Sequence, residues 1–166
     1  MRPVGAAFTT PSWIIGIGAY YRHRAHWRTR SPTIKAGTSM AVELNHTIVM
    51  ARDKKVAATF LTGMLGLPAP TQWGPFEGVA LANGVALDYL DTDGDIHPQH
   101  YAFLVTDAEF DEVLDRLQAL NLAYYADPGH ERPGEINHGD GGRGLYFDDP
   151  NGHNLEIMTR PYGSGQ

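Results

Sequence analysis

The chain has 166 residues, of which 42% are hydrophobic and 19% charged, a composition typical of one globular domain or two small ones. It contains no cysteine, which excludes disulfide bonds, thiolate zinc sites, iron–sulfur clusters and a cysteine nucleophile. The formal net charge of −6 argues against a nucleic-acid partner, for which a basic face is expected. Any metal site must therefore be built from histidine, aspartate and glutamate.

Residues 1–40 differ in charge from the rest of the chain. They carry six basic side chains and no acidic one, whereas the remainder carries seven basic and 19 acidic side chains. An apolar run at residues 13–21 is too short to span a bilayer, and most of the basic residues follow it, unlike in a secretory signal. We predict a disordered basic extension, with a transit peptide or a tether to an anionic surface as alternatives. We expect a cytoplasmic protein with no membrane partner.

Residues 41–95 form the first predicted module. A β-branched segment predicts a strand, and apolar residues at helical spacing predict a helix that Asp53 caps and Gly66 ends. The predicted elements are a strand, a helix and two further strands, at residues 42–50, 53–65, 78–81 and 85–90.

Residues 98–162 repeat the same order, with Asp107 as the expected helix cap. The predicted elements are a strand, a helix and three further strands, at residues 99–105, 107–120, 123–126, 144–147 and 154–159. His46 and His100 occupy the same place in the two modules, as do Asp88 and Glu156. Because two copies of a half-unit usually pair to bury one core, we expect an α+β fold with a cleft between its sheets.

Three ligand-type residues lie on three predicted strands. Alternate residues of a strand share one face, so His46 lies with Leu44, Ile48 and Met50 on the face expected to point inward. His100 and Glu156 lie on strands of the second module. Two imidazoles and one carboxylate can form a facial triad that leaves open positions on the cation. This set favours Fe(II), with Mn(II), Zn(II), Ni(II) or Co(II) as alternatives.

The segment at residues 136–156 resembles the closing hairpin of the glyoxalase/bleomycin-resistance/extradiol-dioxygenase family, the vicinal oxygen chelate superfamily. The resemblance rests on Asp149-Pro150-Asn151-Gly152-His153 followed by Leu155-Glu156-Ile157, and with the duplicated module it covers about residues 41–162. It implies two βαβββ modules that form a curved mixed sheet around a metal-binding cleft. It also implies that His46, His100 and Glu156 are the metal ligands, and that the protein is an enzyme that pairs as a homodimer.

A narrower resemblance is to extradiol ring-cleavage dioxygenases, through His138, Leu145-Tyr146, Asp149-Pro150 and Glu156. It implies a catechol-like vicinal diol as substrate, His138 as acid–base catalyst and Tyr146 as a hydrogen-bonding partner of the substrate. The chain departs from that group in lacking a second active-site histidine before His100, since His97 falls in the linker.

Other polar residues of the second module are candidates for contacts with a substrate. Arg143 lies among glycines and can meet an anionic substrate, while Arg160 and Tyr162 follow the last strand and can close the cleft or contact a second subunit. Residues 128–141 form a long loop, a candidate lid. We expect His130 and His153 to be exposed.

Two other functions stay open. A glyoxalase- or fosfomycin-resistance-type thiol transferase, lyase or isomerase would use the same ligands without dioxygen, and Asp88 stands where the glyoxalase kind has a fourth ligand. A bleomycin-resistance-type protein would bind a drug without metal, but the intact ligand set argues against it. In each case the partner is a small molecule.

Overall fold

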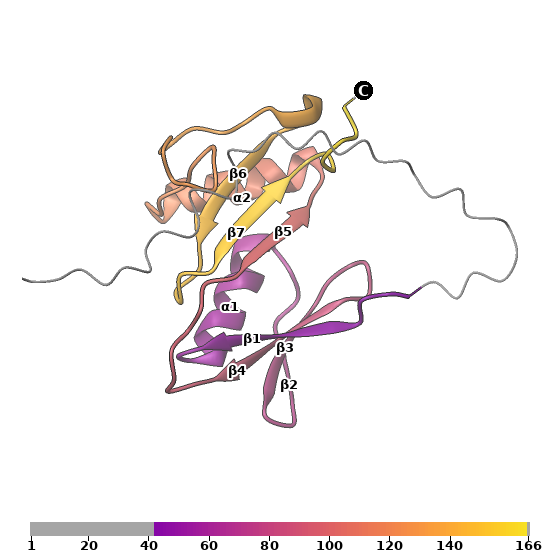
Figure 1. The fold of residues 1–166 in the computed structure, drawn as a ribbon, viewed down its shortest axis with the longest axis vertical. Coiled ribbons are helices and arrows are strands. Elements are labelled where there is room, and N and C mark those ends of the chain that lie inside the picture. Colours follow the sequence, from indigo (N-terminus) through magenta and orange to yellow (C-terminus); the bar gives the residue numbers. More distant parts are fainter. Residues whose placement is uncertain (1–41, 166) are drawn as a thin grey trace, which may run out of the picture. The chain divides into compact units, whose positions relative to one another are not determined.

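The computed structural model describes residues 42–165, so the predicted extension at residues 1–40 lies outside the described part of the chain. The first half begins with strand β1 and ends with β4, which lies beside β1 and runs parallel to it (Figure 1). The strand order in this four-stranded sheet is β1-β4-β3-β2. Its elements are β1 (His46–Ala51), α1 (Lys54–Leu65), β2 (Thr71–Trp73), β3 (Phe76–Ala80) and β4 (Ala86–Asp91).

The second half repeats this arrangement with one strand fewer. Its three-stranded sheet has the order β5-β7-β6, with β5 parallel to β7. The segment at residues 123–126, predicted as a strand, makes only isolated bridges, from Tyr125 to Pro133 and to Tyr146. The elements are β5 (His100–Leu104), α2 (Asp107–Ala119), a short 3₁₀ turn η1 (Gly139–Gly141), β6 (Gly144–Asp148) and β7 (Asn154–Met158).

The predicted α+β class is confirmed, and each predicted module contributes its own mixed sheet. Within residues 42–165 the strands form two separate sheets and no closed barrel. The first strand begins at His46 rather than at residue 42, although the backbone oxygen of Asn45 already accepts the N–H of Ala86. No helix in the described part of the chain is long and apolar enough to cross a membrane.

Both helices begin at side-chain caps. The carboxylate of Asp53 accepts hydrogen bonds from the backbone N–H groups of Lys55 and Val56, as predicted. The cap of α2 is Thr106, one residue before the predicted Asp107. Thr106 and Glu109 bond reciprocally to each other's backbone N–H in a capping box.

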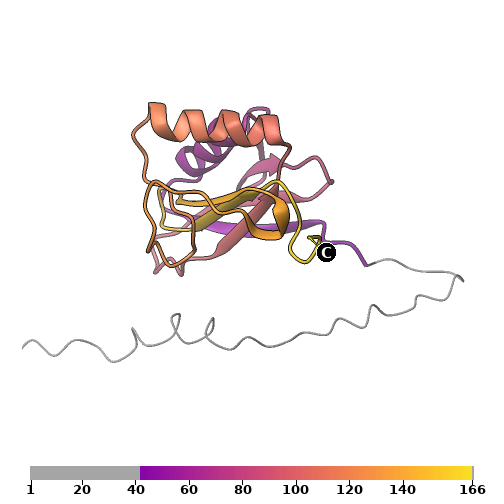
Figure 2. The same ribbon diagram turned by 90° about the horizontal axis from the view of Figure 1, so that it is seen from above.

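The helices decide which face of each strand is buried. Figure 2 shows α1 and α2 on the same side of the strands, and the core lies between them. In β1 the residues that face this core are Val49 and Ala51. The opposite face, which carries His46, leaves Ile48 47% and Met50 36% exposed. The His46 face, which was expected to point inward, thus lies on the side of the sheet that faces away from the helices and the core.

Candidate metal centre

Strands β5 and β7 bring two of the predicted ligands into contact. Because these strands pair in parallel with Ala102 opposite Glu156, the His100 side chain reaches the Glu156 carboxylate, and Nε2 lies 3.2 Å from Oε2. Glu156 is 1% exposed, whereas His100 is partly open to solvent. A buried carboxylate of this kind is costly unless a cation or hydrogen bonds compensate it.

The hydrogen bond at Nδ1 of His100 determines what its other ring nitrogen, Nε2, can do. Its Nδ1 lies 3.1 Å from the backbone oxygen of Asn154, and a carbonyl oxygen can only accept, so Nδ1 carries a proton. Nε2 therefore faces Glu156 either as a second N–H donor or as a lone pair directed at a shared cation. A histidine held by a carbonyl through Nδ1 is the usual arrangement of a metal ligand. The residues present fit one side of a metal site.

The charge of Glu156 also acts on the protonation of His100. The hydrogen bond that His100 donates to Glu156 raises the pKa of the imidazole above its usual range, although partial burial opposes the shift. The contact thus favours a proton on the His100 imidazole where it faces Glu156.

Two tyrosines complete the surroundings of Glu156. The hydroxyl of Tyr162 donates to Glu156 Oε1 at 2.5 Å, so the hydroxyl of Tyr146, 2.7 Å from that of Tyr162, donates to Tyr162. The Tyr146 ring also stacks beside His100, with ring centroids 5.9 Å apart. Burial, with the nearby Tyr162 and Glu156, raises the pKa of Tyr146 above its usual range. The structure thus gathers Tyr146 and Tyr162 with His100 and Glu156.

His46 lies in the other sheet. It is exposed at the start of β1, where Nδ1 is 2.8 Å from the side-chain oxygen of Asn45. Among residues 42–165 no group of three histidine, aspartate or glutamate side chains lies close enough to hold a metal ion. One copy of the chain therefore brings together two of the three predicted ligands and leaves His46 apart.

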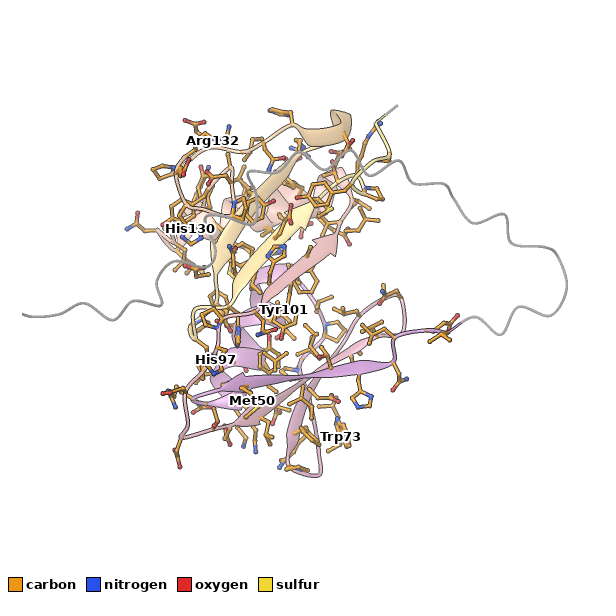
Figure 3. All side chains as sticks on the ribbon, viewed as in Figure 1. Met50, Trp73, His97, Tyr101, His130 and Arg132 are labelled. Atoms are coloured by element: carbon orange, nitrogen blue, oxygen red, sulfur yellow. The ribbon has the colours of Figure 1, made fainter. Side chains whose placement is uncertain are left out.

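Asp88 shares the sheet face of His46. It lies opposite Ile48 in the pairing of β1 with β4 and is 1% exposed. Its Oδ1 accepts a hydrogen bond from the indole Nε1 of Trp73 at 3.2 Å. Trp73, which extends from β2 (Figure 3), was missed by sequence reasoning because β2 is three residues long and carries no periodic pattern.

The predicted substrate-binding arginines lie elsewhere. Arg143 extends to α2, where its guanidinium binds Asp107 and Asp111 and lies 4.5 Å from the centre of the Phe110 ring. The structure does not bring it to the Glu156 cluster. Arg160 lies on the exposed segment after β7, near Gly141 and Gly142.

The predicted acid–base residue, His138, is exposed just before η1, and its side chain makes no capping hydrogen bond to that turn. His153, expected to be exposed, is instead 1% exposed, because backbone groups on two other segments bind both of its ring nitrogens. His130 is half-buried and stacks on Tyr125, with centroids 4.0 Å apart. The loop that carries it is tied down by Asp127, which accepts bonds from three backbone N–H groups.

The sequence profile of the Glyoxalase/Bleomycin resistance protein/Dioxygenase superfamily matches residues 43–157. The chain belongs to this superfamily. The resemblance drawn from the closing hairpin is thereby confirmed at the level of the superfamily, and it accounts for the duplicated order of strands and helices.

Several proteins resemble this member of the superfamily. The solved structure of "Oxidase ChaP-H2" is 63% identical, with a TM-score of 0.74, and the match covers 76% of this chain and 100% of that chain. "Oxidase ChaP-H1" is 58% identical with a TM-score of 0.73, over 74% of this chain and 99% of that chain. "Glutathione transferase FosA" of Serratia marcescens is 29% identical over 126 residues, which cover 71% of this chain and 81% of the relative.

Proposed function

We propose that this superfamily member is a metal-dependent oxidase of a phenolic, vicinal-diol substrate. The observation that carries the proposal is the contact between His100 Nε2 and Glu156 Oε2, with Nδ1 held by the Asn154 carbonyl. The third ligand is His46. Of the divalent cations, Fe(II) suits two imidazoles and a carboxylate with open positions best, and Mn(II), Zn(II) and Ni(II) are the alternatives.

We propose that the chain forms a homodimer in which His46 of one copy joins His100 and Glu156 of the other. Within the described residues a single copy does not gather three ligands. The sheet faces that carry His46 and His100 also expose apolar side chains, among them Ile48 and Leu104. A two-fold pair that buries these faces against each other would form two equivalent sites.

When bound, the cation would polarise the vicinal oxygens of the substrate as a Lewis acid. The protein residues hold the other parts of the site. Glu156 accepts a hydrogen bond from the Tyr162 hydroxyl, and Tyr146 donates one to the same hydroxyl. The phenol group of Tyr162 therefore already lies between Glu156 and Tyr146. A substrate hydroxyl that displaces Tyr162 would find the same donor and the same acceptor. This arrangement favours a phenolic substrate.

Extradiol ring cleavage is the specific reaction that we propose. It breaks one ring carbon–carbon bond and places both atoms of dioxygen in the product, so no external reductant is needed. His138 is the proposed acid–base catalyst, since an imidazole has a pKa near neutrality and can both accept and donate a proton. Arg160 and Tyr162 stay candidates for substrate contact, whereas Arg143 is engaged by α2. Identity of 63% to an oxidase supports oxidation.

A second candidate is a metal-dependent thiol transferase. It is supported by the similarity to FosA and by 26% identity over 121 residues to "Metallothiol transferase FosB" of Lysinibacillus sphaericus, covering 70% of this chain and 81% of the relative. The same ligands would serve this reaction, which consumes a thiol and no dioxygen.

Anaerobic loading of the full chain with Fe(II), followed by catechol and air, distinguishes the two candidates. We expect oxygen uptake and a coloured ring-cleavage product, abolished in Glu156→Gln and unchanged in His97→Ala, an exposed histidine of the linker. His138→Ala should suppress turnover and keep the metal. Consumption of glutathione with fosfomycin and Mn(II), with no oxygen uptake, would establish the second candidate instead.

A further inference from the structure

A pocket on the His46 face of the first sheet is not used by the metal ligands. Its volume is about 250 Å³, and cavities of about 150 Å³ are enough to hold benzene. The pocket therefore has room for a substituted aromatic ring. Its lining comes from the segment after α1 and from β2, β3 and β4: Pro68, Ala69, Thr71, Trp73, Gly78, Ala80, Ala86 and Asp88.

Small residues from two strands, β3 and β4, contribute to the lining of the pocket. Gly78 is the decisive one. A Cβ at this position would lie 3.0 Å from Trp73 Nε1 and 3.2 Å from Asp88 Oδ1. Glycine thus allows the indole to lie close to the carboxylate, and a methyl group at this position would press on both.

Asp88 gives the pocket its polar character. Its carboxylate is almost fully buried, yet the hydrogen bond from Trp73 Nε1 engages only one of its two oxygens. A carboxylate has about four acceptor positions, so it can accept further donors from a ligand. Apolar walls around one acceptor favour a flat ring that presents a hydroxyl group.

The pocket also lies beside a predicted metal ligand. Ala86, which lines it, pairs with His46 in the register of β1 and β4, and paired residues of neighbouring strands share a face. A ring in the pocket therefore lies on the same face of the sheet as His46, next to the metal site of the proposed function.

We propose that this pocket binds the hydroxylated aromatic ring of the substrate, with Asp88 accepting a ring hydroxyl and Trp73 packing against the ring. That this ligand is the substrate rests on the proposed function. The pocket itself exists without metal, so binding can be measured on the metal-free protein.

The test measures ligand binding through the fluorescence of Trp73, which lines the pocket. In the full chain with Trp13→Phe and Trp27→Phe, Trp73 is the remaining tryptophan. We expect 2,3-dihydroxynaphthalene to change its fluorescence saturably in metal-free protein. We expect 2,3-dimethoxynaphthalene, which has the same ring and no donor, to bind at least about tenfold more weakly. Equal affinity for the two probes would overturn the role of Asp88.

Two substitutions test the pocket by independent routes. Asp88→Asn removes the charge at constant size, and Gly78→Ala places a methyl group against the indole and the carboxylate. Each should weaken dihydroxynaphthalene binding about tenfold or more, while Asp95→Asn, an exposed linker residue, should not. Unchanged affinity in both pocket variants, with fold verified by circular dichroism, would overturn the proposal. Tighter binding of 2-naphthylmethylamine than of the diol would overturn the assignment of a hydroxyl ligand.

Metal titration separates this proposal from the proposed function. Calorimetry with Mn(II) should give the same affinity for Asp88→Asn as for the unmodified chain, because Asp88 is assigned to the substrate. Weaker Mn(II) binding in Asp88→Asn would make Asp88 a metal ligand and overturn the assignment. If neither protein binds metal but the diol still binds at Trp73, the proposed function fails and the pocket stands.

Discussion

The imidazole of His153 donates from Nε2 to the backbone oxygen of Met50 at 2.9 Å, although the two residues are 103 positions apart in the chain. Nδ1 accepts the backbone N–H of Gln99 at 3.0 Å. One buried side chain thus joins β1 of the first module to the segment that leads into β5 of the second. The contact fixes the end of β1 against the Asp149–His153 turn.

We expect His153→Ala to destabilise the protein by about 2–3 kcal/mol, because it leaves the Gln99 N–H and the Met50 carbonyl without their partner and opens a cavity where the buried imidazole was. Urea unfolding followed by circular dichroism measures the change. His97→Ala serves as the control, since His97 is exposed in the linker. Equal unfolding midpoints for the two variants would show that His153 does not hold the modules together.

Arg143 should matter for stability rather than for metal binding. Its guanidinium binds two carboxylates of α2 and lies over Phe110. We expect Arg143→Met to cost about 1 kcal/mol, since exposed ion pairs and cation–π contacts each contribute modestly. Arg143→Lys should recover only part of this, because lysine lacks the planar fork. Unfolding and Mn(II) titration together test the assignment, and a loss of metal affinity in Arg143→Met would contradict it.

Glu109 gives the protein a predictable dependence on pH. Hydrogen bonds from the Thr106 backbone N–H and hydroxyl lower the pKa of Glu109 below its usual range. A lowered folded-state pKa stabilises the protein above the unfolded-state pKa, and this contribution is lost as the pH falls through the folded-state value. We expect Glu109→Gln to be less stable than the unmodified chain above about pH 5, and the difference to vanish as the pH falls through the folded-state pKa of Glu109. Unfolding curves at several pH values check this, and a difference that persists at low pH would exclude the charge as its cause.

Sequence reasoning paired the two candidate ligands of the second module because the duplication marks equivalent strand positions. His100 and Glu156 were expected to meet, and the parallel pairing of β5 with β7 brings them into contact. It did not determine which face of β1 the helices cover. Ile48 and Met50 on one face are as apolar as Val49 and Ala51 on the other, so a period of two cannot tell which face the helices cover.

The remaining errors have a different origin. His153 has the polarity of an exposed residue, and only its partners Gln99 and Met50 make its burial favourable. Those partners are distant in sequence and leave no local signal. The partnership of Trp73 with Asp88 is likewise set by the pairing of β2, β3 and β4, which no motif records.

Tyr162 should stabilise the metal-free protein through Glu156. Tyr162→Phe removes the hydroxyl that donates to Glu156 Oε1 and accepts from Tyr146, and the buried carboxylate loses a donor. We expect a loss of about 1–2 kcal/mol without metal. Tyr124→Phe is the matched control, because its hydroxyl accepts only one bond from Gln118, at 3.3 Å. Unfolding in the presence of a chelator measures both, and equal stability of the two variants would show that the Tyr162 hydroxyl contributes nothing there.

The proposed metal site shared between two copies can be tested by mixing two variants that each lack one proposed ligand. His46→Ala and Glu156→Gln homodimers each lack a ligand at both sites. In a mixed dimer one site combines the intact His46 of one copy with the intact Glu156 of the other, whereas the second site carries both substitutions. After unfolding and refolding together, equal amounts should regain about a quarter of the normal metal sites. A site within one chain predicts no recovery, so Mn(II) binding by the mixture decides between the two arrangements. Co-refolding of Glu156→Gln with His100→Ala is the control, because both ligands belong to the same half-site and no mixed dimer restores it.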